Sequence, residues 1–126
     1  MKYLKITDPQ IYKLIKREED RQRQVLEMIP SENYTSSAVL EALGTVLNNK
    51  YSEGYPKKRY YQGNGVADEV ETLAQERAKK LFGVPFANVQ ALSGAPANSA
   101  AEMAILKPGE KLMSCLGLSF QHPWLS

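Results

Sequence analysis

The sequence is poor in cysteine, in histidine and in charge of one sign. Among its 126 residues there are one cysteine, Cys115, and one histidine, His122. A single cysteine excludes an intrachain disulfide, and a single histidine excludes a histidine-based zinc cluster, so we expect no metal site. The 16 basic and 14 acidic side chains leave a net charge of only +2, which does not favour a dedicated nucleic-acid binder.

Long apolar runs are absent as well. No stretch approaches the roughly 18 apolar residues of a membrane-spanning helix, and the first residues, Met1–Pro9, contain no apolar signal core. Together with the lone cysteine, these absences predict a cytoplasmic protein with no membrane partner. The apolar content of 43% and the charged content of 24% are those of an ordinary globular domain with a modest core.

Three patterns predict helices. The first begins at Asp8, a capping residue before proline, and continues through Lys16–Gln24, which has no apolar residue. A helix through that polar run is solvated or bridges to another surface, which favours a helical arm over residues 1–35 that docks on a partner subunit. Apolar spacing predicts further helices over Ser37–Leu47 and Val66–Phe82, and a glycine directly after Phe82 ends the last one.

The last third of the chain has the pattern of a strand–helix–strand unit. Ala87–Leu92 and Lys111–Leu116 are strand candidates, and an alanine-rich helix is expected between them over Pro96–Leu106. This order predicts the beginning of an α/β domain over residues 36–126, in a chain that is otherwise mostly helical with a few short strands. Two strands do not make a stable sheet, so we expect the domain to be incomplete.

The stretch from Asn48 to Ala67 is polar, rich in tyrosine and almost without a regular pattern. Loops this long in compact domains are usually functional or disordered. Tyrosine hydroxyls donate and accept hydrogen bonds, and Glu53 among them is a candidate for proton transfer. Two other interpretations stay open: a solvated loop whose tyrosines only pack their rings, or a segment, Lys57–Tyr61, that binds single-stranded nucleic acid.

Two shorter segments are further candidates. Ser93 and Gly94 lie between a predicted strand and a predicted helix, where free backbone N–H groups can hold an anion such as phosphate. The same turn is also common for purely geometric reasons. Met28–Tyr34 contains turn-forming residues that either cap the next helix or take part in a site.

Five ungapped blocks follow one another along the chain: Pro30–Tyr34, Asn49–Pro56, Lys58–Gly63, Ala87–Gln90 and Ser93–Asn98. Taken in this order, they resemble the N-terminal quarter of serine hydroxymethyltransferases, and the resemblance covers roughly residues 10 to 113. The resemblance implies a pyridoxal-phosphate enzyme of fold type I (aspartate-aminotransferase-like) that interconverts serine and glycine, passes a one-carbon unit to tetrahydrofolate and forms a homodimer or a higher homo-oligomer.

The resemblance also implies a role for each matching residue. Glu53 is the implied proton-transfer carboxyl near the substrate hydroxymethyl group and the folate. Tyr60 and Tyr61 are implied to line the same site, with Tyr61 near the substrate carboxylate. Ser31 is implied to contact the amino-acid substrate, and Tyr51 to reach across the dimer interface to the cofactor phosphate of the neighbouring subunit.

Within its own subunit, the cofactor phosphate is implied to bind Ser93, Gly94 and the amide of Ala95. Many family members have serine where Ala95 stands, which implies one hydroxyl contact fewer here. After the last predicted strand, Phe120–Ser126 replaces a segment that is rich in glycine and histidine in the family. We therefore assign no role to His122, and we interpret this ending as a truncation, a frameshift or an alternative terminus.

No lysine of the sequence has the context of the family's Schiff-base lysine, which lies beside a histidine and follows a threonine run. Lys107 and Lys111 are the only lysines after the helix predicted over Val66–Phe82, and they flank a Pro-Gly turn. The aspartate and the arginine with which the family holds cofactor and substrate are missing too. We therefore expect the chain alone to be inactive. The main alternative is a non-catalytic product that associates with the full-length enzyme.

Overall fold

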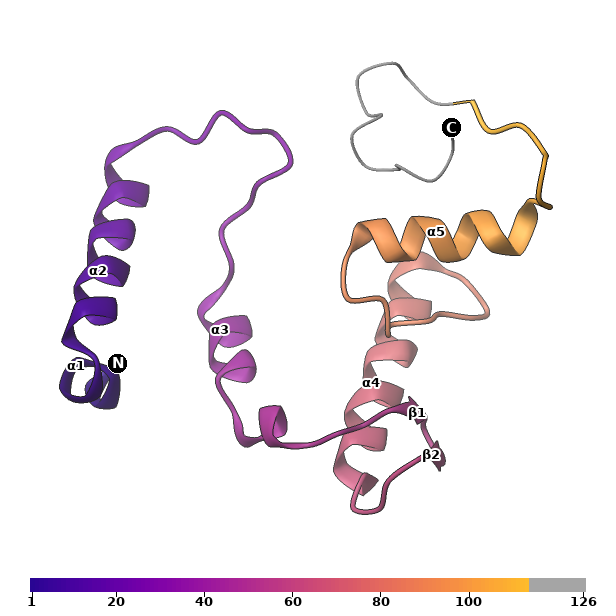
Figure 1. The fold of residues 1–126 in the computed structure, drawn as a ribbon, viewed down its shortest axis with the longest axis horizontal. Helices are drawn as coiled ribbons and strands as arrows, with labels where there is room; N and C mark the ends of the chain where they lie inside the picture. Colours follow the sequence, from indigo (N-terminus) through magenta and orange to yellow (C-terminus); the bar gives the residue numbers. More distant parts are fainter. Residues whose placement is uncertain (114–126) are drawn as a thin grey trace. The chain divides into compact units, whose positions relative to one another are not determined.

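The computed structural model describes residues 1–113, which contain five α-helices, one 3₁₀ helix and one two-stranded hairpin (Figure 1). The chain divides into two compact units, Met1–Asn48 and the part that begins at Asn49. The prediction of a mostly helical chain with short strands is confirmed. The boundary between an arm over residues 1–35 and a domain over residues 36–126 stays a prediction.

The first unit opens with a short helix, α1 (Lys2–Thr7), and a long one, α2 (Pro9–Gln24). α2 begins where the sequence predicts, because the Asp8 carboxylate accepts a hydrogen bond of 3.0 Å from the Ile11 backbone N–H and proline occupies the first helical position. Ion pairs between side chains three residues apart help the polar half to persist in water without an apolar stripe. These pairs are Lys16–Glu19, Glu18–Arg21 and Asp20–Arg23.

The predicted helix over Ser37–Leu47 is wrong in its second half. α3 spans only Ser37–Leu43, and Gly44 is its C-cap. The Thr45 hydroxyl then donates a hydrogen bond of 2.9 Å to the backbone carbonyl three residues earlier. This local bond competes with continuation of the helix, and the chain goes on as a 3₁₀ helix, η1 (Val46–Asn49).

The second unit contains a hairpin inside the loop for which the sequence predicts almost no regular structure. β1 (Gly54–Tyr55) pairs antiparallel with β2 (Lys58–Arg59). Pro56 and Lys57 form the turn, and Lys57 has a φ of +64°, the sign that a type II turn requires at this position. Positive φ is uncommon for lysine, and a hydrogen bond of 2.8 Å from its backbone N–H to Asp68 helps to hold it.

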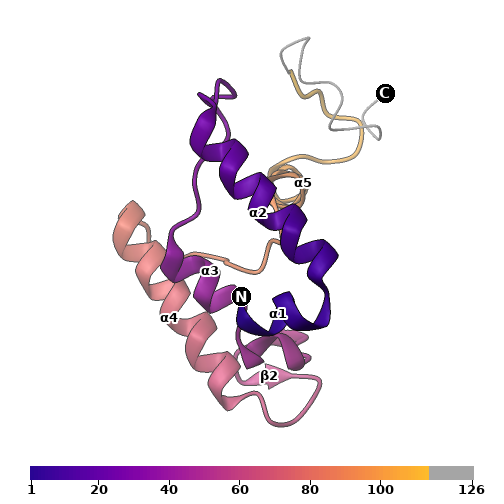
Figure 2. The ribbon, with the colours of Figure 1, turned by 90° about the vertical axis from the view of Figure 1, so that its left-hand side faces the viewer.

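α4 (Gly65–Phe82) confirms the helix predicted over Val66–Phe82, and the hairpin lies beside its first turns (Figure 2). Gly83 ends α4 in the left-handed conformation, with a φ of +63°. α5 (Gly94–Ile105) begins two residues before the predicted start, directly after Ser93.

The strand predicted over Ala87–Leu92 is wrong, because the structure has no strand there. A strand needs a neighbouring backbone for its N–H and C=O groups, and the described residues supply none at this place. The segment uses side chains instead: the Gln90 backbone N–H donates to the Asn88 side chain at 2.9 Å. Residues 111–113 also form no strand, and the rest of the second strand candidate, Cys115 and His122 lie outside the described residues.

Within residues 1–113 no hydrophobic side chain is buried. Large apolar side chains on three helices stay in contact with solvent, among them Leu40 at 59%, Leu81 at 78% and Met103 at 84% exposure. The apolar stripes that predict α3 and α4 are thus present but uncovered in this part of the chain. None of the helices in the described part is long and apolar enough to cross a membrane.

Candidate functional site

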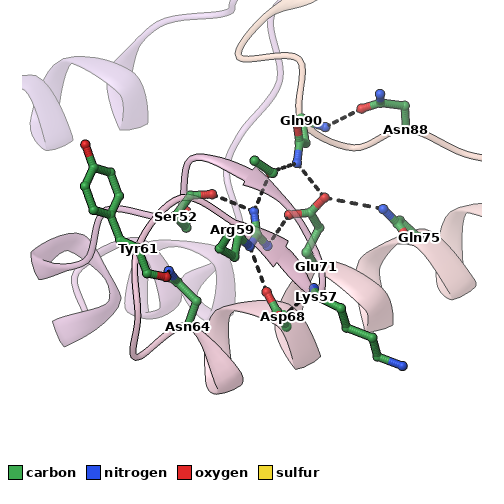
Figure 3. A network of polar contacts seen from close by, with 11 residues as sticks. Ser52, Lys57, Arg59, Tyr61, Asn64, Asp68, Glu71, Gln75, Asn88 and Gln90 are labelled. Atoms are coloured by element: carbon green, nitrogen blue, oxygen red, sulfur yellow. Dashed lines mark hydrogen bonds and ion pairs between the residues drawn. The ribbon is translucent and has the colours of Figure 1, made fainter.

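A polar cluster around Arg59 joins the hairpin to α4 (Figure 3). The Arg59 side chain is only 5% exposed, and its Nε and Nη2 donate to the carboxylates of Asp68 and Glu71, each at 2.7 Å. Its Nη1 donates to the backbone carbonyls of Ser52 at 2.5 Å and Gly54 at 2.7 Å. Arg59 therefore ties the loop that precedes it, from both sides of Glu53, to the rigid helix.

Asp68 and Glu71 meet one guanidinium because they are three residues apart on one face of α4. Hydrogen bonds and charge from these two carboxylates raise the pKa of Arg59. The backbone N–H of Lys57, followed by the Arg59 guanidinium, lowers the pKa of Asp68. Arg59 is not among the site residues that the sequence predicts, although an acidic pair in the first turns of the next helix is a signal for a buried arginine.

Glu53 lies in the middle of the segment that Arg59 holds. Its backbone carbonyl accepts a hydrogen bond of 3.2 Å from the Tyr60 N–H. The carbonyls of residues 52, 53 and 54 are therefore all engaged, whereas the Glu53 side chain is exposed. The structure thus combines a fixed backbone with an accessible carboxyl, which is the arrangement that a proton-transfer group needs.

Two of the four tyrosines of the loop form an aromatic pair. The rings of Tyr51 and Tyr61 lie 6.1 Å apart between centroids and are tilted by 55°, a geometry typical of attractive aromatic pairs. The Asn64 side chain donates to the Tyr61 carbonyl at 2.8 Å and is 5% exposed. Tyr60 is 76% exposed. Tyr61 is therefore held through its backbone carbonyl, and the rings of all three residues are exposed to solvent.

Gln90 connects the segment before α5 to the Arg59 cluster. Its side-chain amide donates to the Gly54 carbonyl and to the Glu71 carboxylate, each at 2.8 Å. In a second contact between the same two segments, the Asn88 side-chain amide donates to the Tyr55 hydroxyl at 3.5 Å. These contacts hold the segment before Ser93 against the hairpin, although the two are far apart in the sequence.

The start of α5 presents free hydrogen-bond donors. Ser93 is the N-cap residue, and its hydroxyl makes no capping hydrogen bond. The Ala97 N–H is already bonded to the Ser93 carbonyl at 3.3 Å, and Pro96 has no N–H. Within residues 1–113, the amides of Gly94 and Ala95 are therefore the ones left without a partner at the positive end of the helix. Two amides and one hydroxyl form a donor set that fits a phosphate group.

Ser31 belongs to the other unit, in the segment between α2 and α3, and is exposed. A turn holds this segment, in which the Glu32 N–H donates to the Ile29 carbonyl at 3.1 Å. The negative charge of Glu27 raises the pKa of the Glu32 carboxyl. Over residues 1–113, no three histidine, cysteine, aspartate or glutamate side chains are arranged to hold a metal ion.

The predicted site residues thus form two groups of contacts in the second unit. Tyr51 is paired with Tyr61, and Glu53 is bonded through its backbone to Tyr60. Ser93–Ala95 form the second group, at the start of α5. Ser31 belongs to the first unit.

Known proteins match nearly the whole chain. The sequence model of the serine hydroxymethyltransferase family matches residues 4–122. Proteins named serine hydroxymethyltransferase are 56% identical over 124 residues in Acidothermus cellulolyticus, 52% over 122 in Desulfotalea psychrophila and 58% over 111 in Helicobacter pylori. These matches cover 96%, 97% and 88% of the chain, which spans only 29%, 28% and 27% of the relatives' lengths. The chain belongs to the serine hydroxymethyltransferase family.

Proposed function

We propose that this chain supplies the N-terminal part of a pyridoxal-phosphate-dependent serine hydroxymethyltransferase of fold type I. The whole enzyme interconverts serine and glycine and exchanges the one-carbon unit with tetrahydrofolate. The observation that carries the proposal is the family match over residues 4–122. The Glu53 loop supports it, because its backbone is fixed and its carboxyl is accessible.

The donors at the start of α5 are the residues that would hold the cofactor phosphate. The Ser93 hydroxyl and the amides of Gly94 and Ala95 fit that group in number and in charge. Tyr51, which is 79% exposed, is free to serve the phosphate bound by a neighbouring subunit of a homodimer or a higher homo-oligomer. When bound, pyridoxal phosphate supplies the electron sink for bond cleavage at the amino acid, and the protein orients the substrate and moves protons.

The remaining residues act on the substrates. Glu53 transfers a proton at the hydroxymethyl oxygen of serine, on the side of the site that receives tetrahydrofolate. Tyr60 and Tyr61 line that side, and the Tyr61 hydroxyl binds near the substrate carboxylate. Ser31 contacts the amino acid.

The chain by itself is then inactive and depends on the rest of the enzyme. The uncovered apolar side chains of α3, α4 and α5 suit association with the rest of the enzyme. We place this enzyme in the cytoplasm. Binding of single-stranded nucleic acid by Lys57–Tyr61 is disfavoured, because one of the basic side chains, Arg59, is 5% exposed and bound to two carboxylates. A phosphate backbone would have to compete with both of them.

A joined protein tests the proposal. Residues 1–113 of this chain replace the matching part of the Acidothermus cellulolyticus relative, and glycine formation from serine is measured with and without tetrahydrofolate. We expect folate-dependent activity. Glu53→Gln is expected to lower kcat by roughly 10²–10⁴, while Glu69→Gln, at an exposed position of α4, leaves it unchanged. An inactive joined protein beside an active parent counts against the function, and a fully active Glu53→Gln variant counts against the residue.

A further inference from the structure

We propose that Arg59 is a positioning residue for Glu53, which sets the direction of the proton-transfer carboxyl without touching the substrate. The inference rests on the proposed function, because it assigns Arg59 to the reaction that Glu53 is proposed to assist. It starts from the hydrogen bonds of the Ser52–Gly54 segment and from the burial of the Arg59 side chain.

The direction of a side chain from the backbone depends on φ and ψ, because each peptide group is planar. The peptide before the Glu53 Cα carries the Ser52 carbonyl, which accepts from Arg59 at 2.5 Å. The peptide after it carries the Glu53 carbonyl, which accepts from the Tyr60 N–H at 3.2 Å. Both peptide planes that meet at Glu53 are therefore held, and with them the direction of its Cα–Cβ bond.

The bond from Arg59 to the Gly54 carbonyl, at 2.7 Å, extends this control to the next peptide. One nitrogen, Nη1, thus bridges the two carbonyls that flank Glu53, as Figure 3 shows for the Ser52 side. The other two nitrogens are fixed by Asp68 and Glu71, which belong to α4. In this way, the loop backbone is anchored to a helix rather than to another loop.

Only arginine suits this place. Its planar guanidinium has five N–H donors on three nitrogens, and here all three nitrogens are used. A lysine would bring one nitrogen, which keeps the charge between Asp68 and Glu71 but cannot also bridge two carbonyls. Arg59→Lys therefore separates the geometric contribution of Arg59 from its charge.

The test uses the joined protein, with Arg77→Lys as the matched control, since Arg77 is exposed on α4. Two reactions of the same site are compared: hydroxymethyl transfer from serine to tetrahydrofolate, and exchange of the glycine α-proton with deuterated water, which transfers no hydroxymethyl group. A displacement near 1 Å at a reacting group lowers rates by up to ~10²-fold. We expect Arg59→Lys to lower kcat of transfer about tenfold to hundredfold, with KM for serine and glycine exchange unchanged.

A double variant adds a readout that a merely structural role would not give. If Arg59 acts through Glu53, Arg59→Lys causes no further loss of transfer in a Glu53→Gln background. An additive loss, or a parallel loss of glycine exchange, overturns the proposal and makes Arg59 a support of the whole site. Unchanged transfer in Arg59→Lys overturns it as well.

Hydrogen exchange of the Tyr60 amide separates this proposal from the proposed function. This amide is protected by the Glu53 carbonyl, and its exchange is measured whether or not the joined protein is active. We expect faster exchange in Arg59→Lys than in Arg77→Lys. Inactivity of the unsubstituted joined protein refutes the function, whereas equal exchange in the two variants refutes the positioning role.

Discussion

Replacing Gly54 by alanine is a sharp test of the hairpin that carries the Glu53 segment. Gly54 has a φ of +98°, and a Cβ there would overlap the Lys58 carbonyl oxygen and lie 3.2 Å from the Arg59 Cα. Strain at such a φ costs on the order of 1–3 kcal/mol. The overlap adds to this, because the neighbouring atoms are backbone and can move only if the two strands separate. We expect a total of about 3 kcal/mol against the hairpin.

Substitutions at two other glycines separate the cost of the backbone conformation from the cost of the steric overlap. Gly83 has a φ of +63°, and an added Cβ meets nothing within 4 Å, so Gly83→Ala tests the backbone conformation alone, at about 1–2 kcal/mol. Gly65, at the start of α4, has neither a positive φ nor a neighbour within 4 Å. Gly65→Ala is therefore expected to be neutral or to stabilise by about 0.4–1 kcal/mol, because it restricts the unfolded chain.

Native-state hydrogen exchange in the joined protein is the assay, because it reports local opening rather than unfolding of the whole molecule. Tyr60 donates to Glu53 across the end of the hairpin, and Val84 donates to Lys79 at the end of α4. Since 1.4 kcal/mol is a factor of about ten, Gly54→Ala should lower the protection of the Tyr60 amide roughly hundredfold. Gly83→Ala should affect only the Val84 amide, roughly tenfold. Equal protection of Tyr60 in Gly54→Ala and Gly65→Ala would refute the reasoning.

Two further predictions concern the phosphate donors and the acidic partner of Arg59. Ala95→Ser adds a hydroxyl beside the open amides of α5, and since a hydrogen bond to a charged group contributes roughly 1.5–3 kcal/mol, we expect pyridoxal phosphate to bind the joined protein at least about tenfold more tightly. A fluorescence titration with Ala101→Ser as control measures this, and equal affinity contradicts it. The pKa of Asp68 is lowered from 3.8 by hydrogen bonds from Lys57 and Arg59, so its contribution to stability is present above pH 3.8 and lost as the pH falls through the lowered pKa. An NMR titration of its carboxyl carbon should show a midpoint below 3.8, and a higher midpoint contradicts the contacts.

The elements that the sequence predicts correctly have signals within one helical turn. Asp8 followed by proline marks the start of α2, and its carboxylate does make the capping bond. Gly83 marks the end of α4 and takes the left-handed conformation that such a C-cap needs. These interactions involve only residues close together in the sequence, so the sequence pattern and the structure agree.

In the second unit, the elements that the sequence does not predict correctly depend on residues far along the chain. A strand over Ala87–Leu92 would need a neighbouring strand, and without one the segment bonds through side chains to the hairpin and α4. The hairpin itself places Lys57 at a positive φ, which composition does not suggest, and Asp68 supports it from α4. Contacts with such distant partners produce no periodic pattern in the sequence, so they cannot be predicted from it.

The candidate site likewise contains residues that the sequence predicts and one residue that it does not. Glu53, the tyrosines and Ser93 are candidates from the sequence pattern and receive their particular roles from the resemblance, and the structure shows Glu53 on a fixed backbone. Arg59 was missed because it ends a run of basic residues, Lys57–Arg59, which on composition alone is a solvated surface. Its burial becomes visible only with Asp68 and Glu71 beside it.

The uncovered apolar side chains of residues 1–113 have a consequence for the life of this chain in a cell. Exposed apolar surface is what chaperones hold and what leads to aggregation and proteolysis. Residues 1–113 produced on their own are therefore expected to aggregate or to be degraded in a cell, whereas the same residues joined to the rest of an enzyme are protected.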